Sequence, residues 1–389
     1  MAGNEWFNHE ERDAVMEIMD RGGVLFRYGF DERRKNIFKV KEFEQKFASY
    51  IGTGYAQAVT SGSTALRVAL GAAGIGAGDE VIAPCFTFVA TVESILESGA
   101  TPVIADIDET LNISPEDIEK RITAKTKAIV PVHMLGAACD MNKIMEIARK
   151  HNLLVIEDTA QACGSTYFGK KLGSIGAMGT YSFDYVKTLT CGEGGIVVTS
   201  DKTIYERSAQ FADHGHMHDP SVPRGLDPKE IYGFNFRMTE LQAAIGLVQL
   251  GKLPKMLETQ RANKNKIKEA LTGVKGISFR PMADPAGDGC DTLIMVLKNP
   301  EKAKAFAAAV AAAKIGTKIL PDALGWHFFG NWPQIYSRIK KYAKKDPVKF
   351  FTKSKKILNK CVAIPINLNM DQSINGIIDG LKKAAKESL

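Results

Sequence analysis

A lysine between two predicted strands is the residue of this sequence best placed for chemistry. Lys187 follows an apolar segment ending at residues 182–183 and precedes a glycine-rich turn, residues 191–195, and a β-branched run, residues 196–199. Because glycine permits backbone conformations that other residues rarely adopt, the chain can turn back and hold the lysine at the mouth of a sheet. An amine held there can form a Schiff base with a carbonyl compound. The alternative is an ordinary solvated lysine, since the chain has 51 Lys and Arg residues.

A Gly/Ser/Thr turn, residues 61–64, precedes an Ala/Leu-rich segment with helical periodicity. The first turn of a helix presents unpaired N–H groups, and hydroxyls beside them can bind an anion such as phosphate. Ser63 and Thr64 are therefore candidate phosphate ligands. The alternative is that one of them only caps the helix.

A carboxylate follows the apolar run 153–156 at the tip of a predicted buried strand. Asp158 at such a place should have a cationic partner. The protonated ring nitrogen of pyridoxal phosphate would be one. Opposite charges at about 4 Å and an effective dielectric of about 20 interact by roughly 4 kcal/mol, or about three pKa units. The alternative role is capping of a following helix.

Aromatic, basic and histidine residues elsewhere supply further candidates. Phe88 follows the predicted strand 80–84 and could stack on a cofactor ring, although core packing is the usual fate of phenylalanine. Arg27 and Tyr28 lie in an aromatic-basic arm that could either pack or grip an anion. Loop residues Asn235 and Arg237 are structural or contact a ligand. His214, His216 and His218 alternate, but Gly215 indicates a loop, so we expect no metal site.

The elements that must position these residues alternate between strand and helix. Apolar strands are predicted near residues 80–84, 102–106, 128–132, 153–157, 178–183 and 195–199, with helices near 89–98, 115–121 and 141–150 between several of them. This alternation predicts an α/β fold with a mostly parallel sheet covered on both faces, whose ligands bind at the carboxyl ends of the strands.

Two domains are predicted for the 389 residues, with 45% hydrophobic content. Residues 1–255 would form an N-terminal arm and a large domain, and residues 256–389 a smaller α+β domain. A helix with a Thr239–Gln242 capping box should run from about residue 240 to 270 between them. The Lys-rich stretch 338–360, with Tyr342, Phe350 and Phe351, is typical of a solvated helix face with an apolar back rather than a nucleic-acid site.

Composition points to a cytoplasmic location and a small anionic ligand. The net charge of +7 is mild for this length and does not require nucleic acid as a partner. The six cysteines form no CxxC pair, which is typical of reduced thiols. The first residues include acidic side chains and lack the apolar core of a secretory signal, and no apolar run is long enough for membrane insertion.

At the level of motifs, the chain resembles the DegT/DnrJ/EryC1/StrS sugar aminotransferases, enzymes of PLP fold type I. The resemblance covers nearly the whole chain. It rests on the order and spacing of SGSTAL (61–66), PCFTFVAT (84–91), DIDE (106–109), PVHMLG (131–136), IEDTAQACG (156–164), SFDYVKTLTCGEGG (182–195), DHG (213–215) and GFNFRMTELQAAIGLVQL (233–250).

The resemblance implies roles by position. Lys187 would carry pyridoxal 5'-phosphate, with pyridoxamine phosphate as the other form of the cofactor. Asp158 would face the ring nitrogen, Gln161 the ring hydroxyl and Phe88 the ring face. Ser63, Thr64 and Ser182 would contact the phosphate. Asn235 would reach the phosphate of a neighbouring subunit, which implies a homodimer with shared active sites.

Some motifs are most similar to the branch that aminates the C8 aldehyde of 8-oxo-Kdo to 8-amino-Kdo for lipopolysaccharide, with glutamate as donor. These motifs are FRYGFD (26–31), YSFDYVKTLTCGEGG (181–195), DHGHMHD (213–219) and GWHFFGNW (325–332). The substrate carboxylate would need a cationic clamp, for which Arg27 and Arg237 are candidates. Tyr28, His214, His216 and His327 could contact the sugar.

Other activities of the same fold remain alternatives. A nucleotide-keto-sugar aminotransferase is one, although Leu135 and Ala137 replace an aromatic and a polar residue that are usual in that branch. Deoxysugar dehydratases have histidine in place of the lysine, so Lys187 disfavours them. A non-catalytic regulator would not need the lysine, the aspartate and the phosphate contacts together.

Overall fold

The computed structural model describes residues 3–219, 221–371 and 373–389. Within them, seven strands form the central sheet in the order β1-β9-β8-β5-β4-β2-β3. Only β9 runs antiparallel to its neighbours, which confirms the predicted mostly parallel sheet. The strands are β1 (Tyr55–Val59), β2 (Glu80–Pro84), β3 (Thr101–Ala105), β4 (Thr126–Ile129), β5 (Leu154–Asp158), β8 (Met178–Ser182) and β9 (Gly195–Thr199).

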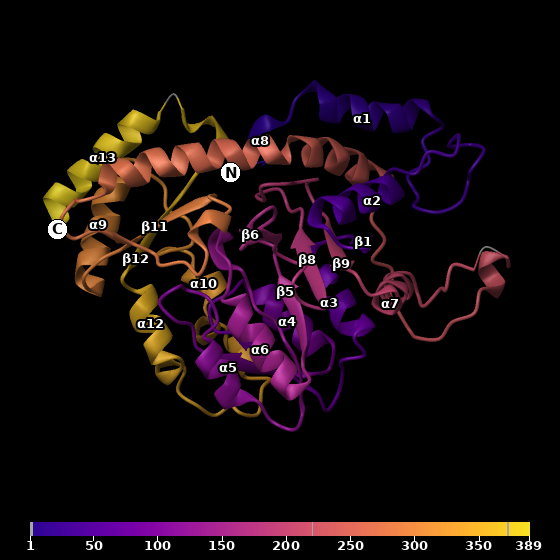
Figure 1. The fold of residues 1–389 in the computed structure, drawn as a ribbon, viewed down its shortest axis with the longest axis horizontal. Helices are drawn as coiled ribbons and strands as arrows, with labels where there is room; N and C mark the ends of the chain where they lie inside the picture. Colours follow the sequence, from indigo (N-terminus) through magenta and orange to yellow (C-terminus); the bar gives the residue numbers. More distant parts are fainter. Residues whose placement is uncertain (1–2, 220, 372) are drawn as a thin grey trace.

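Helices cover both faces of this sheet because alternate strand residues are apolar on both sides (Figure 1). In β2, Val81 and Ala83 pack on one face and Ile82 on the other. The first face is covered by α3 (Gly62–Ala72), α4 (Val89–Glu97) and α7 (Lys202–Ala212). The second is covered by α2 (Lys39–Ile51), α5 (Pro115–Arg121), α6 (Met141–His151) and the start of α8 (Glu240–Leu271). The sheet is thus buried, and its strand ends remain available for a ligand.

The long helix α8 connects the central sheet to the C-terminal part of the chain (Figure 1). The Thr239 side chain accepts a hydrogen bond from the Gln242 N–H, so the predicted capping box is present. The boundary predicted at residue 255/256 falls inside this helix. Its last turns pack with a second sheet, β10 (Ser278–Phe279), β11 (Thr292–Val296) and β12 (Cys361–Pro365), and with α9 (Pro300–Ala312) and α13 (Ile374–Ser388).

The Lys-rich stretch packs its aromatic residues against the central sheet. Tyr342 and Phe350 are buried in the cluster that contains Phe86 and Ile104, and the lysines around them are mostly exposed. The apolar back predicted for this stretch is therefore present, but a regular helix begins only at α12 (Thr352–Leu358). The short helices α10 (Leu324–His327) and α11 (Pro333–Tyr336) precede it.

The remaining elements are short, except for α1 (His9–Asp20), which packs on α8. The loop between α7 and α8 extends away from the main body (Figure 1). The described helices include none with the length and apolarity needed to span a bilayer. The other elements are β6 (Thr166–Tyr167), β7 (Lys170–Lys171), and the 3-10 helices η1 (Gly3–Trp6), η2 (Met134–Gly136), η3 (Arg224–Leu226), η4 (Pro285–Gly287), η5 (Phe329–Asn331), η6 (Pro347–Lys349) and η7 (Leu368–Met370).

Candidate active site

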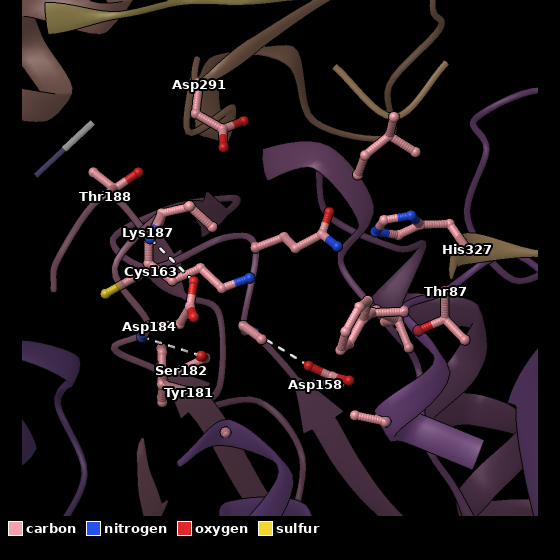
Figure 2. A pocket seen from close by; sticks show the side chains of 18 of the residues that line it. Thr87, Asp158, Cys163, Tyr181, Ser182, Asp184, Lys187, Thr188, Asp291 and His327 are labelled. Atoms are coloured by element: carbon pink, nitrogen blue, oxygen red, sulfur yellow. Dashed lines mark hydrogen bonds between the residues drawn. The ribbon is translucent and has the colours of Figure 1, made fainter. Parts of the chain in front are cut away.

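A cavity of about 640 Å³ lies at the carboxyl ends of β5 and β8, between the central sheet and the C-terminal part of the chain (Figure 2). Half of the residues predicted for the site line it. They are Ser63, Phe88, Asp158, Gln161, Ser182, Lys187 and His327. A volume of this size suits a cofactor-sized ligand.

The turn that follows β8 carries Lys187 into this cavity (Figure 2). Asp184 shapes the turn, because its carboxylate accepts the Val186 N–H (3.0 Å) and its carbonyl accepts the Lys187 N–H (2.9 Å). Gly192, with φ of 84°, then reverses the chain toward β9. Burial lowers the pKa of the Lys187 ammonium from its ordinary value, and Lys318 lowers it further, against Asp184 and Asp158. The arrangement therefore favours a neutral, nucleophilic amine.

Asp158 ends β5 and is almost completely buried in the same cavity (Figure 2). The Thr91 hydroxyl donates to one carboxylate oxygen (2.8 Å), and the Ala160 N–H donates to the other (3.2 Å). Burial raises the pKa of Asp158, whereas these hydrogen bonds and Lys187 lower it. A cation bound against Asp158 would favour the ionised carboxylate.

The neighbouring carboxylate, Glu157, anchors the end of β5 from the opposite side of the strand. It accepts hydrogen bonds from the N–H groups of residues 173, 175 and 176, at 2.7–2.8 Å. The Cys139 N–H donates to His133 Nδ1 (3.1 Å), so the proton on Nε2 is donated to Glu157 (3.1 Å). All of these groups are satisfied inside the protein, so Glu157 serves to hold the strand end that presents Asp158.

The start of α3 meets the end of β8 at the base of the cavity. The Ser61 hydroxyl caps the helix by accepting the Thr64 N–H (3.1 Å), and Thr64 Oγ1 accepts the Ser61 N–H (2.9 Å). The capping residue is thus Ser61, and Thr64 does not line the cavity. A Cβ on Gly62 would lie 2.6 Å from the Ser182 Cβ, so only glycine allows this approach. Ser63 and Ser182 face the cavity beside a helix N-terminus, a combination that suits phosphate.

Phe88 and His327 form an aromatic wall of the cavity that Asp158 also lines. Phe88 lines the cavity and is 42% exposed, so its ring is available to a ligand. His327 lies with its ring centroid 5.5 Å from that of Phe88. Its Nδ1 donates to the Ala323 carbonyl (2.8 Å), which leaves Nε2 as an acceptor, and burial lowers the His327 pKa. A neutral imidazole can accept a hydrogen bond from a hydroxyl group.

Gln161 lines the cavity beside Asp158. Its Oε1 accepts the Leu135 N–H (3.1 Å), so its amide NH2 is the end that remains to donate. Leu135 and Ala137 are buried under this contact. The two residues that differ from the nucleotide-sugar branch therefore pack against the protein and lie outside the cavity lining.

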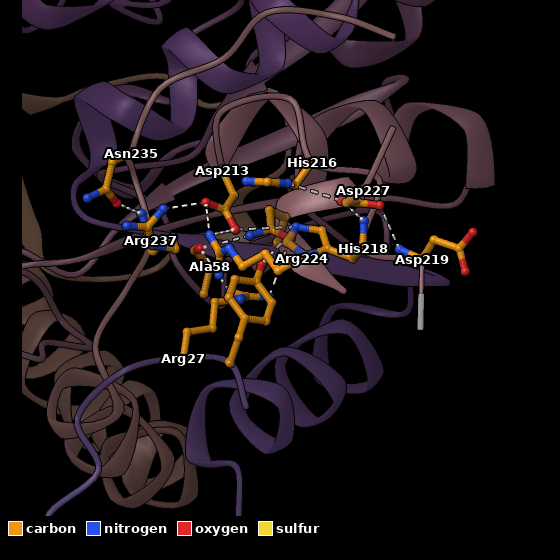
Figure 3. Close-up of polar contacts among 12 residues, drawn as sticks. Arg27, Ala58, Asp213, His216, His218, Asp219, Arg224, Asp227, Asn235 and Arg237 are labelled. Atoms are coloured by element: carbon orange, nitrogen blue, oxygen red, sulfur yellow. Dashed lines mark hydrogen bonds and ion pairs between the residues drawn. The ribbon is translucent and has the colours of Figure 1, made fainter. Parts of the chain in front are cut away.

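The other predicted contacts gather in a separate cluster (Figure 3). The Arg27 guanidinium is buried against Glu44 (2.7 Å). The Arg237 guanidinium pairs with Asp213. His216 Nδ1 lies 3.2 Å from an Asp227 oxygen. The structure thus does not bring Arg27, Arg237 or His216 to the cavity of the same chain.

Three further predicted residues lie in or beside this cluster. Tyr28 stacks on His218, with ring centroids 4.5 Å apart. Asn235 is exposed, and its Oδ1 accepts the Arg237 N–H (3.4 Å). His214 is also exposed, with φ of 55°. Contacts of these residues with a ligand, and of Asn235 with a second subunit, remain predictions.

Several residues of the site were missed from the sequence. Thr91 is four residues after Thr87 at the start of α4, and their hydroxyls lie 2.7 Å apart. The four-residue spacing of the two threonines, which brings side chains together on a helix, is the sequence signal that could have identified this contact. Gln260, Asp291 and Lys318 also line the cavity. No local pattern marks them, because each comes from a different segment of the C-terminal part.

The residues present fit a phosphorylated aldehyde with a basic ring nitrogen. The fit rests on a helix start that a Cβ at Gly62 would obstruct, a buried carboxylate at Asp158 and an amine of lowered pKa at Lys187. Phe88 lines the same cavity and offers a ring face. Such a set can hold the phosphate, pair with the ring nitrogen and bond the aldehyde carbon.

Comparisons with known proteins agree with this geometry. The profile of the DegT/DnrJ/EryC1/StrS aminotransferase family matches residues 34–382. The GDP-perosamine synthase of Caulobacter vibrioides is 44% identical over 253 residues, covering 64% of this chain and 63% of that protein. An uncharacterized protein of Methanocaldococcus jannaschii is 33% identical over 90% of this chain and 91% of its own length. The crystal structure of an aminotransferase from Psychrobacter cryohalolentis superposes with a TM-score of 0.86, at 29% identity and 98% coverage of both chains. The chain spans slightly less than two thirds of the length of the perosamine synthases that it matches.

Proposed function

This chain belongs to the DegT/DnrJ/EryC1/StrS aminotransferase family, and on that premise we propose that it is a sugar aminotransferase dependent on pyridoxal phosphate. The observation that carries the proposal is the meeting of the Lys187 amine and the Asp158 carboxylate in one cavity with a phosphate cradle. When bound, the cofactor supplies an aldehyde carbon that exchanges amino groups and a ring that withdraws electrons.

The residues of this chain have separate tasks in that reaction. Ser63, Ser182 and the start of α3, which lie at one end of the cavity, would bind the phosphate, and Phe88 would pack on the ring. Asp158 would keep a proton on the ring nitrogen, because its buried carboxylate favours a cation beside it. Lys187 Nζ accepts the proton that leaves the Cα of the amino donor and returns a proton to the sugar carbon. A lowered pKa suits this work, since it raises the share of neutral amine relative to an ordinary lysine.

A nucleotide-linked keto-sugar is the acceptor that we favour, with glutamate as the donor. Support comes from the identity of 44–45% with two GDP-perosamine synthases. Leu135 and Ala137, the differences that disfavoured this substrate in the sequence, are buried away from the cavity and do not bear on it directly.

The C8 aldehyde of 8-oxo-Kdo is the second candidate acceptor. The observation that favours it is a cation, Lys318, on the cavity wall, which a sugar acid could use and a neutral hexose would not. Arg27, the clamp first considered, is occupied by Glu44.

The absorption spectrum tests the reaction, and a coupled assay tests the acceptor. Purified protein supplied with pyridoxal phosphate should turn yellow, and glutamate should bleach it. A protein that stays colourless would contradict the proposal. In the presence of glutamate, a GDP-linked keto-deoxysugar should be aminated faster than 8-oxo-Kdo; the reverse order would establish the second candidate.

We also propose a homodimer in which the loop between α7 and α8 completes the partner's site. This loop extends from the main body (Figure 1), and Asn235, near its end and beside Arg237, is exposed (Figure 3). Shared sites of this kind require a two-fold arrangement of subunits.

A further inference from the structure

One wall of the cavity carries polar groups that the proposed amino transfer does not use. Gln260 on α8, Asp291 before β11 and Lys318 all line the cavity from the C-terminal part of the chain. We call these three residues the C-terminal wall. Its member Asp291 lies on the opposite side of the cavity from Asp158 (Figure 2).

Lys318 is the cation of this wall. Its ammonium donates to the Asp291 carboxylate and lies 3.5 Å from the Asp291 carbonyl oxygen. Burial would raise the pKa of Asp291, but the Lys318 ammonium outweighs it and lowers that pKa, which favours the ionised Asp291 carboxylate. An ammonium has three N–H donors, so a ligand oxygen can be bound as well. Among the described residues that line the cavity, the lysines are Lys187 and Lys318, and there is no arginine.

Gln260 supplies a second, independent indication of a ligand. The residue is fully buried, and its Nε2 donates to the Ile366 carbonyl (3.0 Å), which fixes the orientation of the amide. Its Oε1 has no hydrogen-bond partner within the part of the chain that the structure describes. Buried acceptors are rarely left unpaired, so this one calls for a donor from outside the chain. The Ile366 N–H in turn donates to the Asp291 carbonyl (2.9 Å), so Ile366 links Gln260 to the residue that pairs with Lys318.

We propose that the C-terminal wall is a carboxylate subsite of this cavity. Lys318 binds a ligand carboxylate, and Gln260 Oε1 accepts a hydrogen bond from a hydroxyl, amine or amide group of the same ligand. The proposal rests on the proposed function for the reaction carried out beside the subsite. Two ligands of that reaction could bring the carboxylate, namely the amino acid donor and a sugar acid acceptor. In this proposal Lys318 is the cationic clamp for a substrate carboxylate, the role that the sequence predicted for Arg27 and Arg237.

Binding of glutarate tests the subsite without any turnover. Glutarate has two carboxylates and no amine, so it can bind but cannot react. Titration calorimetry of the full-length protein should show glutarate binding at least about tenfold weaker to Lys318→Met than to wild type, because a charge-assisted hydrogen bond is lost. Lys318→Arg should restore most of the affinity. Lys150→Met, which removes an exposed ion pair with Glu119, is the matched control and should bind normally.

The Lys318→Met variant leaves the Asp291 carboxylate without its cation, so its free energy of unfolding should be lower than that of wild type. The double variant Lys318→Met, Asp291→Asn removes both charges and should show the same loss of glutarate affinity while keeping the fold. Wild-type affinity in either variant would overturn the proposal. Bleaching of the wild-type protein by glutamate, measured separately, shows whether a negative result concerns the subsite or the proposed function.

Kinetics then identifies the source of the carboxylate. A rise in KM for glutamate in Lys318→Met assigns the subsite to the amino donor. A rise in KM for 8-oxo-Kdo, with KM for a GDP-linked keto-sugar unchanged, assigns it to a sugar acid. If neither KM changes, the proposal is wrong.

Gln260→Met tests the acceptor in the wall. This variant should bind glutarate as well as wild type does. It should lose the several-fold advantage that we expect 2-hydroxyglutarate, which has an additional hydroxyl, to have over glutarate in wild type. If the ratio of 2-hydroxyglutarate affinity to glutarate affinity is the same in Gln260→Met and in wild type, Gln260 is not part of the subsite. That result would overturn this part of the proposal.

Discussion

Asp158 is buried and Lys187 is half-buried, and their environments push their proton affinities in opposite directions. Burial lowers the pKa of the lysine and raises the pKa of the aspartate, so each is shifted toward its neutral form. A cofactor that offers an aldehyde to the one and a cationic nitrogen to the other satisfies both. The same buried environment that costs stability thus prepares the two groups for a ligand.

The lowered pKa of Lys187 predicts a pH profile for its reaction with pyridoxal phosphate. Only the neutral amine attacks an aldehyde, so the rate should rise with pH and level off above the lysine pKa. We expect the midpoint below the ordinary value of 10.5. Stopped-flow absorbance of the cofactor-free protein mixed with pyridoxal phosphate measures it. A midpoint at or above the ordinary value would show that burial does not control this amine.

Thr91 is expected to stabilise Asp158 through its hydroxyl. Thr91→Val removes the donor at 2.8 Å and leaves a buried carboxylate oxygen unpaired, which costs about 1–3 kcal/mol. It should also raise the Asp158 pKa further and weaken cofactor binding. Thr91→Ser keeps a hydroxyl and is the control. Urea unfolding and cofactor titration measure the two effects; equal behaviour of the Val and Ser variants would rule out this role.

Individual residues of the site were predictable where one segment carries both the residue and its context. Lys187 lies between two strands, and Asp158 follows an apolar run, so each could be found from its neighbours in sequence. Lys318 and Gln260 could not, because their importance comes from Asp291 and Ile366, which are distant in the chain. Arg27 was predicted as a ligand contact from its aromatic neighbours, yet Glu44 pairs with it in the fold.

At the level of elements, the close approach of α3 to β8 shapes the phosphate cradle. Gly62→Ala would place a Cβ 2.6 Å from the Ser182 Cβ. We expect a loss of about 1–3 kcal/mol of stability from overpacking, with weaker binding of pyridoxal phosphate. Denaturant unfolding and cofactor titration measure these changes.

The matched control is a glycine with space around it. A Cβ on Gly251, in α8, would meet no atom within 4 Å, so Gly251→Ala should stabilise the protein by roughly 0.5–1 kcal/mol. If both alanine variants behaved alike, the close contact between Gly62 and Ser182 would not be the cause.

Most elements could be predicted because their periodicity is local. β2 and β9 occupy the predicted residues, and α8 ends one residue past the predicted 270. β4 ends at Ile129, short of the predicted residue 132, since Pro131 has no N–H to donate to a neighbouring strand. The stretch 338–360 was predicted to be a helix face with an apolar back, but its aromatic residues Tyr342, Phe350 and Phe351 pack together as one cluster against the central sheet, which sequence periodicity does not reveal.

For the whole molecule, the proposed homodimer predicts that two inactive variants can rescue each other. Lys187→Ala removes the amine from its own chain's site, and Asn235→Ala removes the contact expected across the interface. A mixed dimer then holds one intact site, so refolding equal amounts together should regain roughly one quarter of the wild-type sites. Glutamate-driven bleaching counts them.

A mixture as inactive as its components would mean that each chain completes its own site. The structure would then require another role for the extended loop and its exposed Asn235. Light scattering of the wild-type protein measures the mass of its assembly, independently of activity.

The whole-molecule architecture was predictable because alternating apolar strands and helices permit few packings. The position of the C-terminal part against the sheet was not, since it depends on contacts such as Phe329 N–H to the Cys85 carbonyl (2.9 Å). Such contacts carry no pattern in the sequence.

The central claim is that Lys187 is the amine that carries pyridoxal phosphate. Borohydride reduction of the yellow protein, followed by proteolysis and mass spectrometry, fixes the cofactor to the amine that holds it and identifies the residue. We predict a pyridoxyl group on Lys187, and its loss in Lys187→Ala. A pyridoxyl group on another lysine, or none on any, would contradict the account.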